Sequence, residues 1–241
     1  TGSRRHCYRS SSIRYMINLQ ELPKFYDKIG YAPHEHIQDF FHQDVFEDLR
    51  TNFPSNNLFG DELPERRKQN QRPHHRRLMC VYEGSDAFFD HYKVDINRLP
   101  NIWQQIITLF SDNNGKYQDW LKRILEVKDF TIRFDFHRTK SGLDVSPHVD
   151  TASKIGSHLF YFMPYGWQED YGGTTIFYKN KLVPQGNPEP ADFAEFKTYP
   201  VIGNYSLLFK NTPDGWHGVK PIINNAGLHR QIFSVVIHEK K

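Results

Sequence analysis

The sequence has few cysteines, little net charge and no long apolar run. Its 241 residues include two cysteines, Cys7 and Cys80, too few for a disulfide framework, although one bridge is compatible with the count. The formal net charge of +3 argues against a nucleic-acid partner. No apolar run approaches the ~20 residues that span a bilayer, and residues 1–20 lack the apolar segment of a secretory signal. We therefore expect a flexible N-terminal tail over 1–20, a cytoplasmic protein and no membrane contact.

Aromatic residues are abundant, at 15% of the chain, which is typical of a globular, β-rich protein. Apolar residues recur at helical spacing from His34 to about Phe53, and the following Pro54 would end a helix there. Two further amphipathic patterns predict helices over residues 102–110 and 117–125, with Gly115 as the break between them.

After Asp129 the pattern changes to short β-branched and aromatic runs separated by Gly, Pro and Asn. The expected strands are 130–136, 158–163, 174–178, 205–209 and 232–237, and a long loop is expected over 180–198. Helices followed by a run of strands favour a mainly β fold, a double-stranded β-helix (jelly-roll) barrel with N-terminal helices. We expect a single domain, with helices and first strands over 21–128 supporting a barrel core over 129–241.

The segment 60–77 is rich in arginine, lysine and histidine. A run of like charges is typical of a solvated loop. The alternative is a lid or an anion-binding edge over a cleft. The composition alone leaves both open.

Two His-x-Asp pairs occur in this chain of 13 histidines, where one is expected by chance. His42 and Asp44 fall in the first predicted helix, where side chains two apart point about 200° away from each other. His148 and Asp150 follow Pro147, which favours extended chain, where side chains two apart project to the same side. Only the second pair is therefore expected to converge on one metal ion.

A third ligand is expected on a later strand, since two histidines and one carboxylate leave three positions open on non-haem Fe(II). His217, after a strand and a Pro-Asp-Gly turn, is the best candidate. His158 is an alternative, but it is too near Asp150 to add a facing strand. His229 and His238 lie outside or at the end of the last strand, where an ordinary surface histidine is more common.

Arg230 begins the last predicted strand. A buried arginine needs an anion, and its planar guanidinium suits a carboxylate. A dicarboxylic cosubstrate that chelates iron at one end would place its other carboxylate there. The alternative is an arginine whose side chain extends from the strand end to water.

Taken in order, His-x-Asp, a distal His and an Arg about a dozen residues later resemble the Fe(II)- and 2-oxoglutarate-dependent dioxygenases. The linking text HLFYFMPYGWQEDYGGTTIFY resembles the prolyl-4-hydroxylase-like branch, with Tyr161, Trp167, Gly172 and Gly173 in corresponding places. The match covers about half of the chain, from Phe130 to His238. One departure is the segment FDFHRTKSG, where the branch often has a Tyr-Pro-Gly-like sequence.

The resemblance implies that His148, Asp150 and His217 hold Fe(II) and that Arg230 pairs with the far carboxylate of 2-oxoglutarate. Tyr161 would add a hydrogen bond to the cosubstrate or serve as a core aromatic. Many members carry a hydroxyl two positions after the Arg; here that position is Ile232, and Ser234 follows two further on. Lys154 is expected on the surface, with contact to an anionic substrate as the alternative.

The implied reaction is hydroxylation of a prolyl side chain, a free amino acid or another small metabolite, with O2 consumed, 2-oxoglutarate converted to succinate and ascorbate as a possible reductant. Related halogenases lack the carboxylate that Asp150 supplies, so halogenation is not expected. Desaturation, demethylation and ring formation stay open, as do a non-catalytic metal-binding barrel and a nucleic-acid-directed enzyme. Substrate identity and oligomeric state are not encoded in any motif.

Overall fold

The computed structural model describes residues 16–18, 30–62, 76–81, 90–184 and 187–240. The tail over 1–15, Cys7 and most of the basic segment (63–75) lie outside these residues. Helices and strands follow one another in this order: β1 (His34–Gln38), α1 (Gln43–Thr51), η3 (Asn56–Leu58), β2 (Gly60–Glu62), β3 (Arg76–Val81), η5 (Ile96–Arg98), α3 (Asn101–Ser111), α4 (Lys116–Leu125), β4 (Thr131–Thr139), β5 (Val145–His148), β6 (Lys154–Tyr161), η6 (Glu169–Tyr171), β7 (Thr175–Lys181), η7 (Pro190–Asp192), β8 (Phe193–Thr198), β9 (Tyr205–Lys210), β10 (His217–Val219) and β11 (Arg230–His238).

The strands form two antiparallel sheets that make the predicted jelly roll. The larger sheet has the order β1-β9-β6-β11-β4-β3-β2, and the smaller sheet has the order β5-β10-β7-β8. From β4 onward, consecutive strands alternate between the larger and the smaller sheet, except that β7 and β8 form a hairpin within the smaller sheet. We call the face of the larger sheet toward the smaller sheet the inner face. The mainly β, double-stranded β-helix fold is therefore confirmed.

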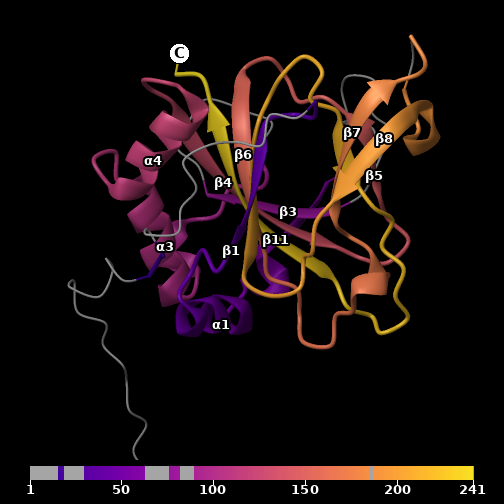
Figure 1. Ribbon diagram of the computed structural model, residues 1–241. Helices are drawn as coiled ribbons and strands as arrows, with labels where there is room; N and C mark the ends of the chain where they lie inside the picture. The colour runs from indigo at the N-terminus through magenta and orange to yellow at the C-terminus, as the bar shows by residue number, and fades with distance from the viewer. Residues whose placement is uncertain (1–15, 19–29, 63–75, 82–89, 185–186, 241) are drawn as a thin grey trace, which may run out of the picture.

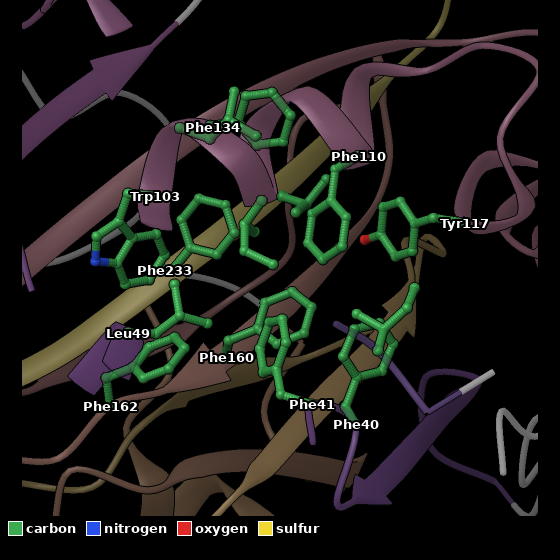
Figure 2. Packing of buried hydrophobic residues seen from close by; sticks show 14 of the residues in the cluster. Phe40, Phe41, Leu49, Trp103, Phe110, Tyr117, Phe134, Phe160, Phe162 and Phe233 are labelled. Carbon is green, nitrogen blue, oxygen red and sulfur yellow. The ribbon is translucent and has the colours of Figure 1, made fainter. Parts of the chain in front are cut away.

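Helices α1, α3 and α4 cover the outer face of the larger sheet, on the opposite side of the molecule from β5, β7 and β8 (Figure 1). In α3 the buried residues recur every three or four positions, so one face meets the sheet. Aromatic side chains fill this layer. Trp103 of α3 packs edge-on against Phe233 of β11 (Figure 2). Trp103 also packs edge-on against Phe136 of β4. This aromatic core fixes the larger sheet as a rigid base for the barrel.

The helix predictions over 102–110 and 117–125 are confirmed by α3 and α4, and Gly115 is the N-cap that separates them. The helix predicted from His34 to Phe53 is wrong in its first half. That half is strand β1, which pairs with β9, and Asp39 at a φ of 52° turns the chain toward α1. The spacing of Ile37 and Phe40 fits a helix, and the pairing of β1 with β9 is not visible locally.

The loop predicted over 180–198 is wrong at both ends, which belong to strands β7 and β8. Strand β7 continues to Lys181, and β8 returns along it, with Tyr178 opposite Phe196. The proline and glycine content of the segment indicated a loop, but the pairing of β8 with β7 supplies hydrogen bonds that composition does not reveal.

Candidate metal centre

Three side chains that the sequence singled out meet at one end of the smaller sheet. His148 is the last residue of β5, and His217 is the first residue of β10, directly opposite it in the antiparallel register. Asp150 follows two residues after His148. Gly218 allows β10 to lie this close to β5, because a Cβ there would be 2.6 Å from the carbonyl oxygen of Val145. We call His148, Asp150 and His217 the triad.

The ligand atoms of the triad are close enough to share one ion. His217 Nε2 lies 3.6 Å from Asp150 Oδ2, and the two imidazole centroids are 4.3 Å apart. One ligand atom from each side chain lies within 4.8 Å of the other two. For bonds of about 2.1 Å, neighbouring ligands sit about 3 Å apart, so small side-chain rotations suffice. Within the described ranges no other such group of three is found.

Backbone carbonyls orient both imidazoles. His148 Nδ1 lies 3.0 Å from the carbonyl oxygen of Ser146, and His217 Nδ1 lies 2.8 Å from that of Gly215. A carbonyl accepts only, so Nδ1 carries the proton and donates it. The Nε2 lone pair of each ring is then directed to a metal, which is the arrangement seen around metal-binding histidines.

The protonation states also suit a metal. Burial lowers the pKa of His148 to about 3, and the neighbouring His217 acts in the same direction. Burial also lowers the pKa of His217, so both rings are neutral at neutral pH. Burial alone would raise the pKa of Asp150, but the Lys154 ammonium and the two imidazoles hold it well below its usual value. The triad therefore offers two neutral imidazoles and one carboxylate.

Arg230 begins β11 and is buried on the inner face, at 6% exposure. Its Nε donates a hydrogen bond to the carbonyl oxygen of Gly173 at 2.6 Å, and its guanidinium carbon lies 5.9 Å from the centroid of the Tyr161 ring. The Tyr161 hydroxyl donates to Thr175 Oγ1 at 2.8 Å. The arginine is thus held in the barrel beside an aromatic ring rather than extended into water.

The Gly-Gly segment is part of this arrangement. Gly172 has a φ of 76°, and a Cβ there would lie 2.0 Å from the carbonyl oxygen of Pro221. Gly173 follows with a φ of 75° and supplies the carbonyl that holds Arg230. These two positions need glycine because the backbone is left-handed and, at Gly172, tightly packed.

Ser234 is buried farther along β11, between Asp135 and Leu159 in the sheet register. It shares a face with Arg230, but four residues of strand separate their Cα atoms by about 13 Å. A shared contact with one carboxylate of the cosubstrate stays a prediction for Ser234.

The rejected histidines lie elsewhere. His158 faces the helices, with Nδ1 3.0 Å from the Tyr117 hydroxyl and Nε2 3.0 Å from Ser206 Oγ. It links α4 to the larger sheet. His42 is the N-cap of α1 rather than a residue within a helix, and it does not join the triad.

The surface position expected for Lys154 is wrong. Its side chain is only 15% exposed, and Nζ lies 2.8 Å from Asp150 Oδ2. Lys154 begins β6 with its side chain on the inner face, where Nζ also lies 5.8 Å from the Phe209 ring. A single sequence does not indicate which lysine at a strand start is turned inward.

Sequence reasoning missed a polar strip on the inner face of β4. Arg133 Nε and Nη2 donate to the two carboxylate oxygens of Asp135, each at 2.9 Å. Cys80 Sγ lies 3.1 Å from Asp135 Oδ1, and Arg133 Nη1 lies 3.4 Å from His238 Nε2. In FTIRFDF the residue types alternate, so a strand over this segment has Arg133 and Asp135 on the face opposite the phenylalanines. The alternation does not show that this face is buried.

No protein-family model matches the chain, and no curated protein matches it. Among solved structures, the chain matches a prolyl hydroxylase from Trichoplax adhaerens, in complex with a hypoxia inducible factor peptide fragment, with a TM-score of 0.56 and 16% identity. That match covers 95% of this chain and 90% of the other.

A Pseudomonas putida prolyl-4-hydroxylase matches with a TM-score of 0.51 and 12% identity, over 87% of this chain and 94% of that one. The chain has the fold of the 2-oxoglutarate- and Fe(II)-dependent oxygenases. The non-heme alpha ketoglutarate dependent carbocyclase SnoK from nogalamycin biosynthesis also matches, with a TM-score of 0.52 and 10% identity over 97% and 85% of the two chains. At these identities the likeness concerns the fold, and function has to be argued from the residues.

The donor set itself fits an Fe(II) ion. Two imidazoles and one carboxylate on one side of an ion are typical ligands of non-haem iron and leave positions open. Asp150 Oδ2 is buried, and because a carboxylate oxygen carries more than one lone pair, the contact with the Lys154 ammonium at 2.8 Å leaves a lone pair for a metal.

Proposed function

We propose that this protein is an Fe(II)- and 2-oxoglutarate-dependent dioxygenase that hydroxylates an unactivated C–H bond. The observation that carries the proposal is the convergence of the triad at one end of a barrel whose inner face also holds Arg230. Three ligands from the protein leave three positions on an octahedral ion, enough for a bidentate cosubstrate and O2. When bound, the iron would activate O2, which is the oxidant: one oxygen atom would end in succinate as 2-oxoglutarate loses CO2, and the other in the new hydroxyl group of the substrate.

In this proposal His148, Asp150 and His217 hold the ion, and the carbonyls behind both imidazoles fix its position. Arg230 binds the far carboxylate of 2-oxoglutarate, because a buried guanidinium is best neutralised by a carboxylate. Tyr161, whose hydroxyl already bonds Thr175 beside the arginine, adds a further hydrogen bond, and Ser234 extends the polar lining. Ascorbate would keep the iron reduced between turnovers.

The proposed substrate is a prolyl side chain, a free amino acid or another small metabolite. The Trichoplax neighbour holds a peptide fragment, which supports a peptidyl substrate for this fold. Ring formation is the second candidate outcome, because the matching carbocyclase uses the same cofactors for that reaction.

Among the described residues, no helix is both long and apolar enough to cross a bilayer.

The test is succinate formation by purified protein supplied with Fe(II), 2-oxoglutarate, ascorbate and air. Even without a substrate, slow cosubstrate decarboxylation is expected from wild type. Variants Asp150→Ala and Arg230→Ala should both lack it. Equal succinate formation in all three proteins would refute the proposal.

A further inference from the structure

A cation beside the triad has no role in the reaction described so far. Lys154 Nζ lies 2.8 Å from Asp150 Oδ2, the same oxygen that faces His217 Nε2. The lysine side chain is 15% exposed, so its ammonium is largely withdrawn from water. Holding a charge in this position costs free energy unless an opposite charge compensates it.

Without a metal, the charges around Lys154 are balanced. Asp150 compensates Lys154, and Asp135 compensates Arg133 through a two-bond ion pair. His238 lies across the sheet from Lys154 and contacts Arg133. Burial, together with the two cations, lowers the pKa of His238 to about 4, so it adds no charge at neutral pH.

The charge balance around Lys154 changes once the metal and 2-oxoglutarate are bound. A divalent ion, the Asp150 carboxylate, the Arg230 guanidinium and the two carboxylates of 2-oxoglutarate together carry no net charge. Arg133 remains paired with Asp135. The Lys154 ammonium then lacks a full counter-charge, at a distance of one side chain from the metal and on the inner face of the barrel.

We propose that Lys154 binds a carboxylate of the substrate, so that the substrate is an anionic molecule whose carboxylate lies beside the iron site. This inference rests on the proposed function and narrows its substrate class. The carboxylate belongs either to a free amino or hydroxy acid or to an acidic side chain next to the target residue of a peptide. Both present the same group to the same ammonium.

The neighbouring residues support this assignment. The inner face next to Lys154 carries polar groups from β4 and β11, including His238, Arg133 and Ser234, which suit a polar ligand. On the other side, Phe209 packs against both Lys154 and His217, with ring centroids 4.8 Å apart in the second contact. The Lys154 ammonium therefore lies between the Phe209 ring and the polar side chains of β4 and β11. This position favours contact with one anionic ligand over contact with bulk water.

In the experiment, Mn(II) and then 2-oxoglutarate are titrated into the protein, and calorimetry measures the affinity of each. One series then adds the twenty free L-amino acids and their C-terminal amides. A second series adds end-capped tripeptides with a central proline flanked by glutamate or by glutamine. In at least one of the two series, we expect the ligand with the carboxylate to bind about tenfold more tightly than the matched ligand in which an amide replaces it.

The variants separate charge recognition from a structural role. Lys154→Met should lose the preference for the acid by about tenfold while its uncharged partner binds as before. Its Mn(II) affinity should be equal or higher, since a cation beside the metal has been removed. Lys154→Arg should keep the preference. Lys122→Met, which removes a lysine on α4 that pairs with Asp119, is the matched control and should behave as wild type.

Three results would overturn the inference: no acid preferred in either series, an unchanged preference in Lys154→Met, or loss of Mn(II) and 2-oxoglutarate binding in that variant. The last result would mean that Lys154 only positions Asp150. Failure of the proposed function can be told apart from failure of this inference alone. If the proposed function is wrong, wild type does not bind Mn(II) and 2-oxoglutarate before any acid is added, and the inference about Lys154 is then refuted as well.

Discussion

His217 lies directly opposite His148 in the register of β10 and β5, and their ring centroids are 4.3 Å apart. The two histidines are thus held by the hydrogen bonds of a sheet, and Asp150 follows two residues after the end of β5. Sites on strands are positioned more precisely than sites on loops. The triad is therefore expected to bind metal without a large rearrangement.

Removing a triad ligand should abolish tight metal binding. Asp150→Ala and His217→Ala should each weaken Mn(II) or Fe(II) binding by more than about 100-fold, because two ligands remain of three. A metal at 100 times its Kd should stabilise wild type by about 2.7 kcal/mol and leave both variants unchanged in thermal unfolding. His42→Ala, from the other His-x-Asp pair, is the control and should bind metal as wild type does.

Arg230→Ala should weaken 2-oxoglutarate binding by about 30-fold or more, since it removes one member of a buried charge pair. Metal affinity should change by less than about threefold. Titration of 2-oxoglutarate into Mn(II)-loaded protein measures this, with Arg123→Ala on α4 as the control. A parallel loss of metal and cosubstrate binding would contradict the assigned role.

Gly172 and Gly227 have similar positive φ angles, 76° and 69°, but different surroundings. A Cβ at Gly172 would meet the Pro221 carbonyl oxygen at 2.0 Å, whereas nothing lies within 4 Å of one at Gly227. Gly227→Ala should cost about 1–2 kcal/mol of unfolding free energy for the backbone alone. Gly172→Ala should cost a further ~1–3 kcal/mol. Urea unfolding measures both, and equal costs would contradict the close packing at Gly172.

The stability of the metal-free protein should fall as the pH drops. Burial and the neighbouring cations lower the pKa of His238 from 6.5 to about 4 on folding. Between those values the unfolded chain binds more protons, so stability is full above pH 6.5 and is lost as the pH falls toward 4. The pKa values of His158 and His36 are lowered by burial as well, and act in the same direction.

Urea midpoints at pH 7.5 and pH 5 test this linkage. Wild type should have the lower midpoint at pH 5, and His238→Gln, which cannot titrate, should show a smaller difference between the two. An identical pH dependence in both proteins would mean that His238 is not one of the groups responsible.

The barrel was predictable from the sequence because strands β4, β6, β7, β9 and β11 contain short runs rich in aromatic and β-branched residues. Strands β1 and β8 were missed because their pairing with β9 and β7 is not encoded in local periodicity. The triad could be proposed from extended geometry at His148 and Asp150. The inward position of Lys154 could not, since charge alone predicts exposure and only the fold decides which face a strand residue takes.

The polar strip on β4 could also be predicted only in part from the sequence. The alternation in TIRFDF placed Arg133 and Asp135 on one face, which is correct. That this face points into a barrel next to the triad depends on the smaller sheet lying over it, and such packing is a property of the whole chain.

Anaerobic titration of 2-oxoglutarate into the Fe(II)-loaded protein, followed by visible absorption, tests whether the triad binds iron together with the cosubstrate. Chelation of Fe(II) by 2-oxoglutarate gives a weak charge-transfer band, and we predict that it appears at one equivalent in wild type. The band should be absent from Asp150→Ala and should need a much higher 2-oxoglutarate concentration in Arg230→Ala. An iron-loaded wild-type protein that shows no band at saturating 2-oxoglutarate would contradict the assignment of the triad and of the cosubstrate.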